Sequence, residues 1–123
     1  MVRNLASAIG LFVLCNTWAA QVTAHPLTLA ECTEGAEFIR NAALARDNGV
    51  TREFFVDKLV EDLVLIQSFP PHLRWFVQDP SDEILLSEAV FKVFDEPMNA
   101  DQHQASFVSA CLQTAELVDG RRI

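Results

Sequence analysis

The sequence predicts an all-α domain made of four main helices and one short helical turn, closed by one disulfide bond. Three observations support this prediction. Apolar residues recur every three or four positions over four segments, which is the period of an amphipathic helix. N-cap residues and proline or glycine stops separate these segments, and no segment has the alternating pattern of a strand. Two cysteines, Cys32 and Cys111, enclose most of the domain.

The first two helices are predicted between Thr28 and Pro70. Thr28 and Glu31 form a capping box at the start of the first helix, and Gly49 provides the left-handed residue that ends it. Its apolar stripe consists of Leu29, Cys32, Ala36, Ile39 and Ala43. The second helix starts at Thr51, and apolar residues occupy much of its circumference, namely Phe54, Phe55, Val56, Leu59, Val60, Leu63, Val64, Leu65 and Ile66. So broad an apolar surface predicts that the second helix is the central, most buried one.

The other two helices are predicted between Asp79 and Gly120. Pro80 follows the N-cap Asp79 and opens the third helix, because the first helical position needs no backbone donor. The fourth helix begins near Asn99, with Gln102 completing a capping box, and ends at Gly120. Their buried stripes are Ile84, Leu85, Ala89, Val90, Val93 and Phe94 in the third, and Phe107, Val108, Cys111, Ala115 and Val118 in the fourth. Together the helices form an orthogonal or an up-and-down bundle.

Residues 1–24 have the layout of a secretory signal peptide, with a basic start, a short apolar run and a small-residue exit. A cut after Ala24 fits the small-x-small pattern best, and a cut after Ala20 is the alternative. The apolar run is shorter than the roughly 20 residues of a transmembrane helix. A lipoprotein signal at Cys15 is disfavoured because a leucine precedes that cysteine. We therefore expect a periplasmic or secreted protein with one domain, residues 25–123.

The cysteines and the net charge limit the compartment and the class of partner. Removal of the leader leaves Cys32 and Cys111, which pair in an oxidising compartment. The loop-entropy model gives about 4.5 kcal/mol of stabilisation for a closed loop of about 80 residues. Two buried free thiols are the alternative. The net charge of −8 disfavours nucleic acid and anionic membranes as partners and favours a basic protein.

An acidic stripe on the second helix is the first candidate binding surface. Glu53, Asp57 and Glu61 recur every four residues, and Asp62 lies beside them. Like charges at this spacing destabilise a helix by a few tenths of a kcal/mol per pair, so a basic partner would relieve the repulsion. The alternative is a solvated face with charges paired inside the domain, by Arg40, Arg46 or Lys58.

The loop from Phe69 to Phe76 is the second candidate binding surface. It carries His72, Arg74 and Trp75 after two consecutive prolines. Tryptophan and arginine dominate the energetics of protein interfaces, and a Pro-Pro segment presents them at low entropic cost. The alternative is structural: Trp75 and Phe76 cover one end of the core, with Arg74 paired to an acid.

The sequence contains no recognisable catalytic, cofactor or metal motif. His25, His72 and His103 lack the spacing of a zinc site, and both cysteines of the domain are better used in a disulfide. Neither a Gly-x-Ser-x-Gly motif nor a glycine-rich phosphate loop occurs. The carboxylates of the acidic stripe are expected in water, where their pKa values are not driven apart as acid–base catalysis requires. We therefore expect a protein that is not an enzyme and needs no cofactor or metal.

Cys32, the run from Ala42 to Thr51 and the late Cys111 resemble a group of small exported helical proteins of proteobacteria. In these, a cysteine early in the first helix precedes an Ala-rich stretch and an Arg-Asp-x-Gly-x-Thr sequence. In plan, the chain is also similar to the periplasmic immunity proteins that act against type VI-delivered amidase toxins. That similarity implies an immunity or inhibitor protein. The chain also shares its size and single disulfide with acid-activated periplasmic chaperones. This similarity implies the alternative function, an acid-responsive chaperone, and a small enzyme is the third possible function.

Overall fold

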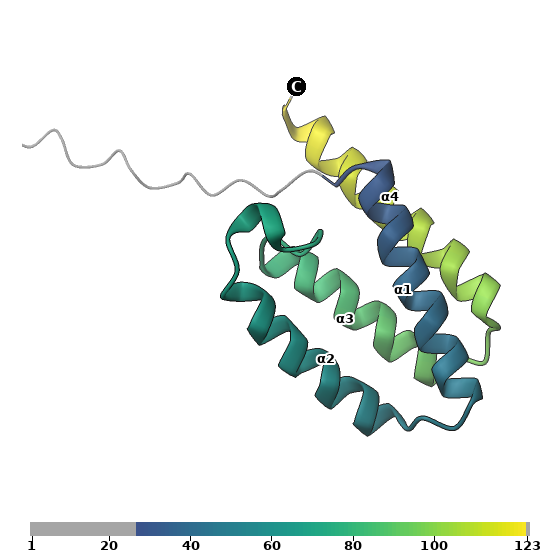
Figure 1. The fold of residues 1–123 in the computed structure, drawn as a ribbon. Helices are drawn as coiled ribbons and strands as arrows, with labels where there is room; N and C mark the ends of the chain where they lie inside the picture. The colour runs from purple at the N-terminus through teal and green to yellow at the C-terminus, as the bar shows by residue number, and fades with distance from the viewer. Residues whose placement is uncertain (1–26, 123) are drawn as a thin grey trace, which may run out of the picture.

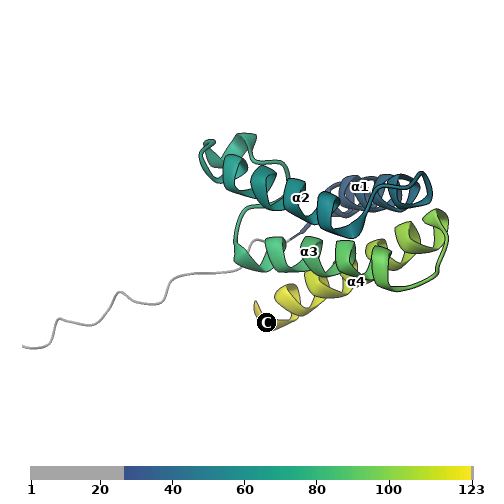
Figure 2. The same cartoon turned by 90° about the horizontal axis from the view of Figure 1, so that it is seen from below.

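The computed structural model describes the backbone of residues 27–122 and the side chains of residues 27–115. Within this part the chain forms four α-helices and a short 3-10 turn: α1 (Leu29–Asp47), α2 (Arg52–Gln67), η3 (Pro71–Leu73), α3 (Pro80–Asp95) and α4 (Ala100–Arg122). Consecutive helices run in opposite directions (Figure 1), and α1 and α2 lie above α3 and α4 in two layers (Figure 2). The predicted all-α class is confirmed. The expected signal peptide, residues 1–24, lies outside the described residues.

The helix ends follow from local side-chain chemistry. At the start of α1 the hydroxyl of Thr28 accepts a hydrogen bond from the Glu31 backbone N–H at 3.1 Å, and the Glu31 carboxylate accepts one from the Thr28 N–H at 3.0 Å. Gly49 has a φ of +97°, as expected of a residue that ends a helix. The predicted end of α4 at Gly120 is wrong, because the helix continues to Arg122. A glycine weakens a helix by about 1 kcal/mol but does not by itself stop it.

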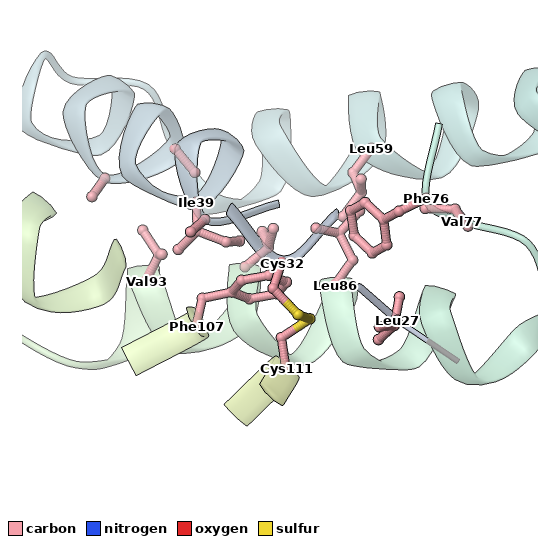
Figure 3. Packing of buried hydrophobic residues seen from close by; sticks show 14 of the residues in the cluster. Leu27, Cys32, Ile39, Leu59, Phe76, Val77, Leu86, Val93, Phe107 and Cys111 are labelled. Carbon is pink, nitrogen blue, oxygen red and sulfur yellow. A yellow bond between two sulfur atoms is a disulfide. The ribbon is translucent and has the colours of Figure 1, made fainter. Parts of the chain in front are cut away.

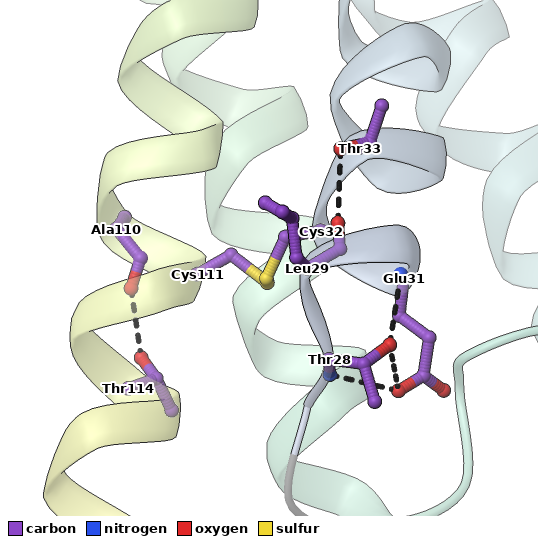
Figure 4. Close-up of a disulfide and its surroundings, with 8 residues drawn as sticks. All are labelled: Thr28, Leu29, Glu31, Cys32, Thr33, Ala110, Cys111 and Thr114. Atoms are coloured by element: carbon purple, nitrogen blue, oxygen red, sulfur yellow. Dashed lines mark hydrogen bonds between the residues drawn. A yellow bond between two sulfur atoms is a disulfide. The ribbon is translucent and has the colours of Figure 1, made fainter.

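The most extensive contact between helices joins α1 and α4, which run antiparallel. Cys32 and Cys111 connect them through the predicted disulfide, with a Cα–Cα distance of 5.6 Å and a sequence separation of 79 (Figure 4). Both cysteines are fully buried. The contact is close because small residues of α1, Gly35 and Ala36, lie on its buried side, and the ring of Phe107 in α4 packs directly on Gly35.

The central helix is α1, and the prediction that α2 is the most buried helix is wrong. Six residues of α1 are buried, whereas α2 buries only Leu59 and Leu63. Figure 3 shows Ile39 of α1, Leu86 of α3 and Phe107 of α4 around the disulfide. The reason is steric: small residues let a helix approach two neighbours closely, whereas a helix with large apolar residues all round buries only the side that meets a neighbour. Here α2 lies at the edge of the bundle (Figure 2).

Two further residues that were assigned to buried stripes are exposed. Leu29 is 64% exposed and Ile84 is 57% exposed. Leu29 lies in the first turn of α1, and Ile84 lines a groove between α3 and the peripheral α2. Leu86, which is fully buried, takes the inward position that the prediction gave to Ile84.

We predict that Gly35→Ala destabilises the domain, although alanine is the better helix former by about 1 kcal/mol. A Cβ at position 35 would lie 2.6 Å and 2.9 Å from two ring atoms of Phe107 and 3.1 Å from the ring of Phe76. Overpacking of this kind costs about 1–3 kcal/mol. Urea denaturation monitored by circular dichroism measures the change.

Asn41→Ala is the matched control, because Asn41 is exposed on the same helix. Its effect should follow helix propensity alone and be slightly stabilising. A Gly35→Ala variant as stable as the wild type would mean that α1 and α4 do not approach as closely as described.

Candidate functional site

The acidic stripe lies on the side of α2 that faces away from the bundle. Glu53, Asp57 and Glu61 are all exposed. Four large apolar residues share this side, and each is between 55% and 64% exposed, namely Phe54, Val60, Val64 and Leu65. At 100° per residue, all seven side chains fall in one arc opposite the buried Leu59. We call these seven residues the α2 outer face.

The carboxylates of the α2 outer face have few basic partners inside the domain. Lys58 pairs with Glu61 at 3.4 Å. The suggested partners Arg40 and Arg46 are placed elsewhere, because Arg40 pairs with Asp101 at 3.1 Å and Arg46 with Asp47 at 2.9 Å. Among the described side chains no ion pair involves Glu53 or Asp57. The repulsion along the stripe is therefore only partly offset by local pairing.

Arg74 closes the C-terminal end of α2, and among the described side chains no ion pair involves it. Its Nε donates a hydrogen bond to the carbonyl oxygen of Phe69 at 2.7 Å, and its Nη2 donates one to that of Gln67 at 3.0 Å. Carbonyls at a helix end lack partners within the helix, and a guanidinium group satisfies them well. His72, two residues earlier, is exposed in the 3-10 turn. The loop thus folds back on the end of α2.

Trp75 is half-buried and packs within an aromatic cluster. Its ring centroid lies 5.6 Å from that of Phe38 and 4.3 Å from that of Phe76. Its φ of +36° lies in the left-handed region, which costs a bulky residue on the order of 1–3 kcal/mol. Phe76 beside it is almost fully buried. This packing supports the structural alternative, in which both rings cover one end of the core, while a binding role for Trp75 stays a prediction.

A cavity of about 310 Å³ opens beneath Trp75, between α2 and the rest of the bundle. Its lining is apolar except for one carboxylate, and consists of Phe38, Leu59, Asp62, Leu63, Ile66, Trp75 and Leu86. We call it the Trp75 cavity. The structure thus brings together two of the predicted site residues, Asp62 and Trp75, and places the other carboxylates of α2 on its outer face. No sequence pattern predicts this cavity, because its walls come from segments far apart in the chain.

Arg46 and His103 form a polar cluster where the end of α1 meets the connection between α3 and α4. Arg46 Nη1 donates to the carbonyl oxygen of Val93 at 2.6 Å, and its Nη2 donates to that of Met98 at 2.9 Å. His103 is only 2% exposed. Its Nε2 lies 3.3 Å from the carbonyl oxygen of Glu96 and 3.4 Å from Arg46 Nη1.

Sequence reasoning missed this cluster by treating His103 as an isolated side chain near a helix start. A signal was available, because His103 lies four positions before Phe107 and eight before Cys111 and therefore shares the inner stripe of α4. Burial lowers the pKa of His103 from its usual value of 6.5, and the positive charges of Arg46 and Lys92 lower it further, against the opposing effect of Glu96. The imidazole is therefore held neutral at neutral pH.

Three other features bear on the class of site. Among the described side chains, no three from histidine, cysteine or carboxylate residues come together as a metal site would require. No helix in the described part of the chain combines the length and the apolar character of a membrane span. Comparison with protein families, with curated proteins and with solved structures gives no significant match in any of the three.

We predict that the stability of the domain falls as the pH drops below about 6.5 and that His103 causes part of this loss. Because the pKa of His103 is lowered in the folded state, the unfolded chain takes up the proton first, so stability is full above about 6.5 and decreases below it. One such group contributes a slope of at most about 1.4 kcal/mol per pH unit. Denaturant unfolding at several pH values between about 7.5 and 5 measures this dependence of the free energy of unfolding on pH.

His103→Gln should flatten this pH dependence, because glutamine does not titrate in that range. His72→Gln is the control, since it removes an exposed imidazole and should leave the wild-type profile unchanged. Equal slopes for His103→Gln and the wild type would exclude His103 as the titrating group.

Proposed function

We propose that the protein is a non-enzymatic binding protein of the periplasm or the extracellular space, an immunity or inhibitor protein whose partner is a basic protein. The observation that carries this proposal is the α2 outer face. Single exposed apolar side chains are common on protein surfaces, but four large ones in one arc of a helix are typical of an interaction surface.

The charges on this face favour a basic partner. Glu53, Asp57 and Glu61 lie among the apolar side chains, and the chain as a whole has a net charge of −8. Carboxylates at an interface steer a basic protein and raise its association rate, while the apolar side chains provide most of the affinity. A second copy of this chain is a poor partner for the same surface, because its carboxylates would face each other.

The disulfide fits the proposed compartment. Disulfides such as Cys32–Cys111 form and persist in secreted and periplasmic proteins and are rare in the reducing cytosol. The layout of residues 1–24, which predicts cleavage after Ala24, agrees with this placement.

The experiment is a capture from the native periplasm followed by binding kinetics with the captured protein. We expect a basic protein, bound at least tenfold more weakly by Val64→Glu, because the new charge stands in the apolar part of the α2 outer face. Gln113→Glu is the control: it adds the same charge at an exposed position of α4 and should bind like the wild type. The double variant Asp57→Lys/Glu61→Lys should mainly slow association, and more so at low salt.

Two results would contradict the proposal. One is that no basic protein is captured from the native periplasm. The other is that Val64→Glu and Gln113→Glu bind a captured protein equally well, which would place the interface away from α2.

The buried His103 favours a second candidate function, an acid-responsive periplasmic chaperone. Protonation of His103 would put a positive charge 3.4 Å from the Arg46 guanidinium, weakening the contacts that hold α1 against the α3–α4 connection. Apolar-dye binding and suppression of client aggregation at about pH 3 would support this function. A domain that stays closed to the dye under those conditions would leave the binding protein as the better proposal.

A further inference from the structure

We propose that the Trp75 cavity binds a small cationic amphiphile, a molecule whose apolar chain or ring ends in an ammonium group. This inference is independent of the partner proposed for the α2 outer face, because the cavity lies on a different side of α2. It rests on three properties of the cavity: its size, its walls and its single charge.

The size and the walls suit a small apolar group. At about 310 Å³ the cavity lies at the lower end of the range for small-molecule sites, which is about 300–1,000 Å³. Among its lining residues, Leu59 and Leu86 are buried, and the rings of Phe38 and Trp75 lie in contact with each other. Such a surface offers an apolar chain dispersion contacts and release from water.

The charge at the cavity selects a cation. Asp62 is the one ionisable residue in the lining, and among the described side chains no ion pair involves it. The nearest lysine along the helix, Lys58, pairs with Glu61 instead. An ammonium group seated beside Asp62 would also lie near aromatic rings, whose faces attract cations. A carboxylate ligand of the same shape would be repelled.

The position of α2 gives access to the cavity. Only Leu59 and Leu63 of α2 are buried, so this helix has few contacts to break if it shifts to admit a ligand. Trp75 lies in a strained backbone conformation, which is common among residues that line ligand sites. Its half-exposed indole also provides an optical probe at the cavity itself.

The experiment uses the full chain carrying Trp18→Phe, which leaves Trp75 as the only tryptophan. Octylammonium, octanol and octanoate are titrated separately, and Trp75 emission and the melting temperature are followed. We expect a saturable emission change and a higher melting temperature with octylammonium, a weaker response with octanol and the weakest with octanoate. These three probes share one chain and differ in the charge of the head group.

Matched variants separate the charge from the cavity. Asp62→Asn should weaken octylammonium binding about three- to fivefold and leave octanol binding unchanged, whereas Asp57→Asn on the α2 outer face should change neither. Ile66→Phe fills the cavity and should weaken both ligands at least tenfold. Val64→Phe makes the same kind of change outside the cavity and should have no effect.

The inference is overturned if octylammonium gives no saturable response, if octanoate binds as tightly as octylammonium, or if each variant behaves like its control. None of these results bears on whether a basic protein binds the α2 outer face. Failure of the periplasmic capture would likewise leave the octylammonium result unaffected.

Discussion

The close antiparallel contact between α1 and α4 is the constraint on which the rest of the structure depends. Three different interactions hold it at successive levels: the Cys32–Cys111 disulfide near the start of α1, the Phe107 ring on Gly35 one turn later, and the Arg46–His103 cluster at its far end. The disulfide restricts the unfolded chain, and the glycine permits the short distance between the helices. The arginine satisfies backbone carbonyls in the last turn of α3 and in the α3–α4 connection.

This arrangement leaves α2 at the edge of the bundle, and its position creates both candidate sites. One side of α2 does not pack fully against α3 and the loop from Phe69 to Phe76, so the Trp75 cavity, with apolar walls and one carboxylate, remains between them. The opposite side meets nothing within the described residues and presents apolar and acidic side chains together. The well-packed pair α1 and α4 thus supports α2, which carries one candidate binding surface on each of its two sides.

Local features of the fold could be predicted from the sequence because they depend on neighbouring residues. The capping box at Thr28 and Glu31, the left-handed Gly49 and the start of α3 at Asp79-Pro80 are all decided within a few positions. The disulfide was predictable because only two cysteines remain after the expected leader.

Features that depend on how the helices pack against one another could not be predicted in the same way. Apolar content shows how much surface a helix could bury, but not how much of it a neighbour covers. For this reason the apolar pattern wrongly predicts α2 as the central helix. The small residues around Gly35 were the better signal for the centre, since they allow close approach on the buried side of α1. The Trp75 cavity could be recognised only from the three-dimensional structure. Asp62 and Trp75 come together only because the loop from Phe69 to Phe76 folds back on the end of α2.

Native-state hydrogen exchange tests most directly the claim that α1 and α4 form a stable platform for a weakly held α2. We expect the amides of α1 and α4 to exchange only through global unfolding, whereas those of α2 exchange through a local opening of lower free energy. Reduction of Cys32–Cys111 should lower the protection of α1 and α4 by several kcal/mol, up to about 4.5 kcal/mol, and change the opening of α2 much less. Equal protection of all three helices, before and after reduction, would contradict it.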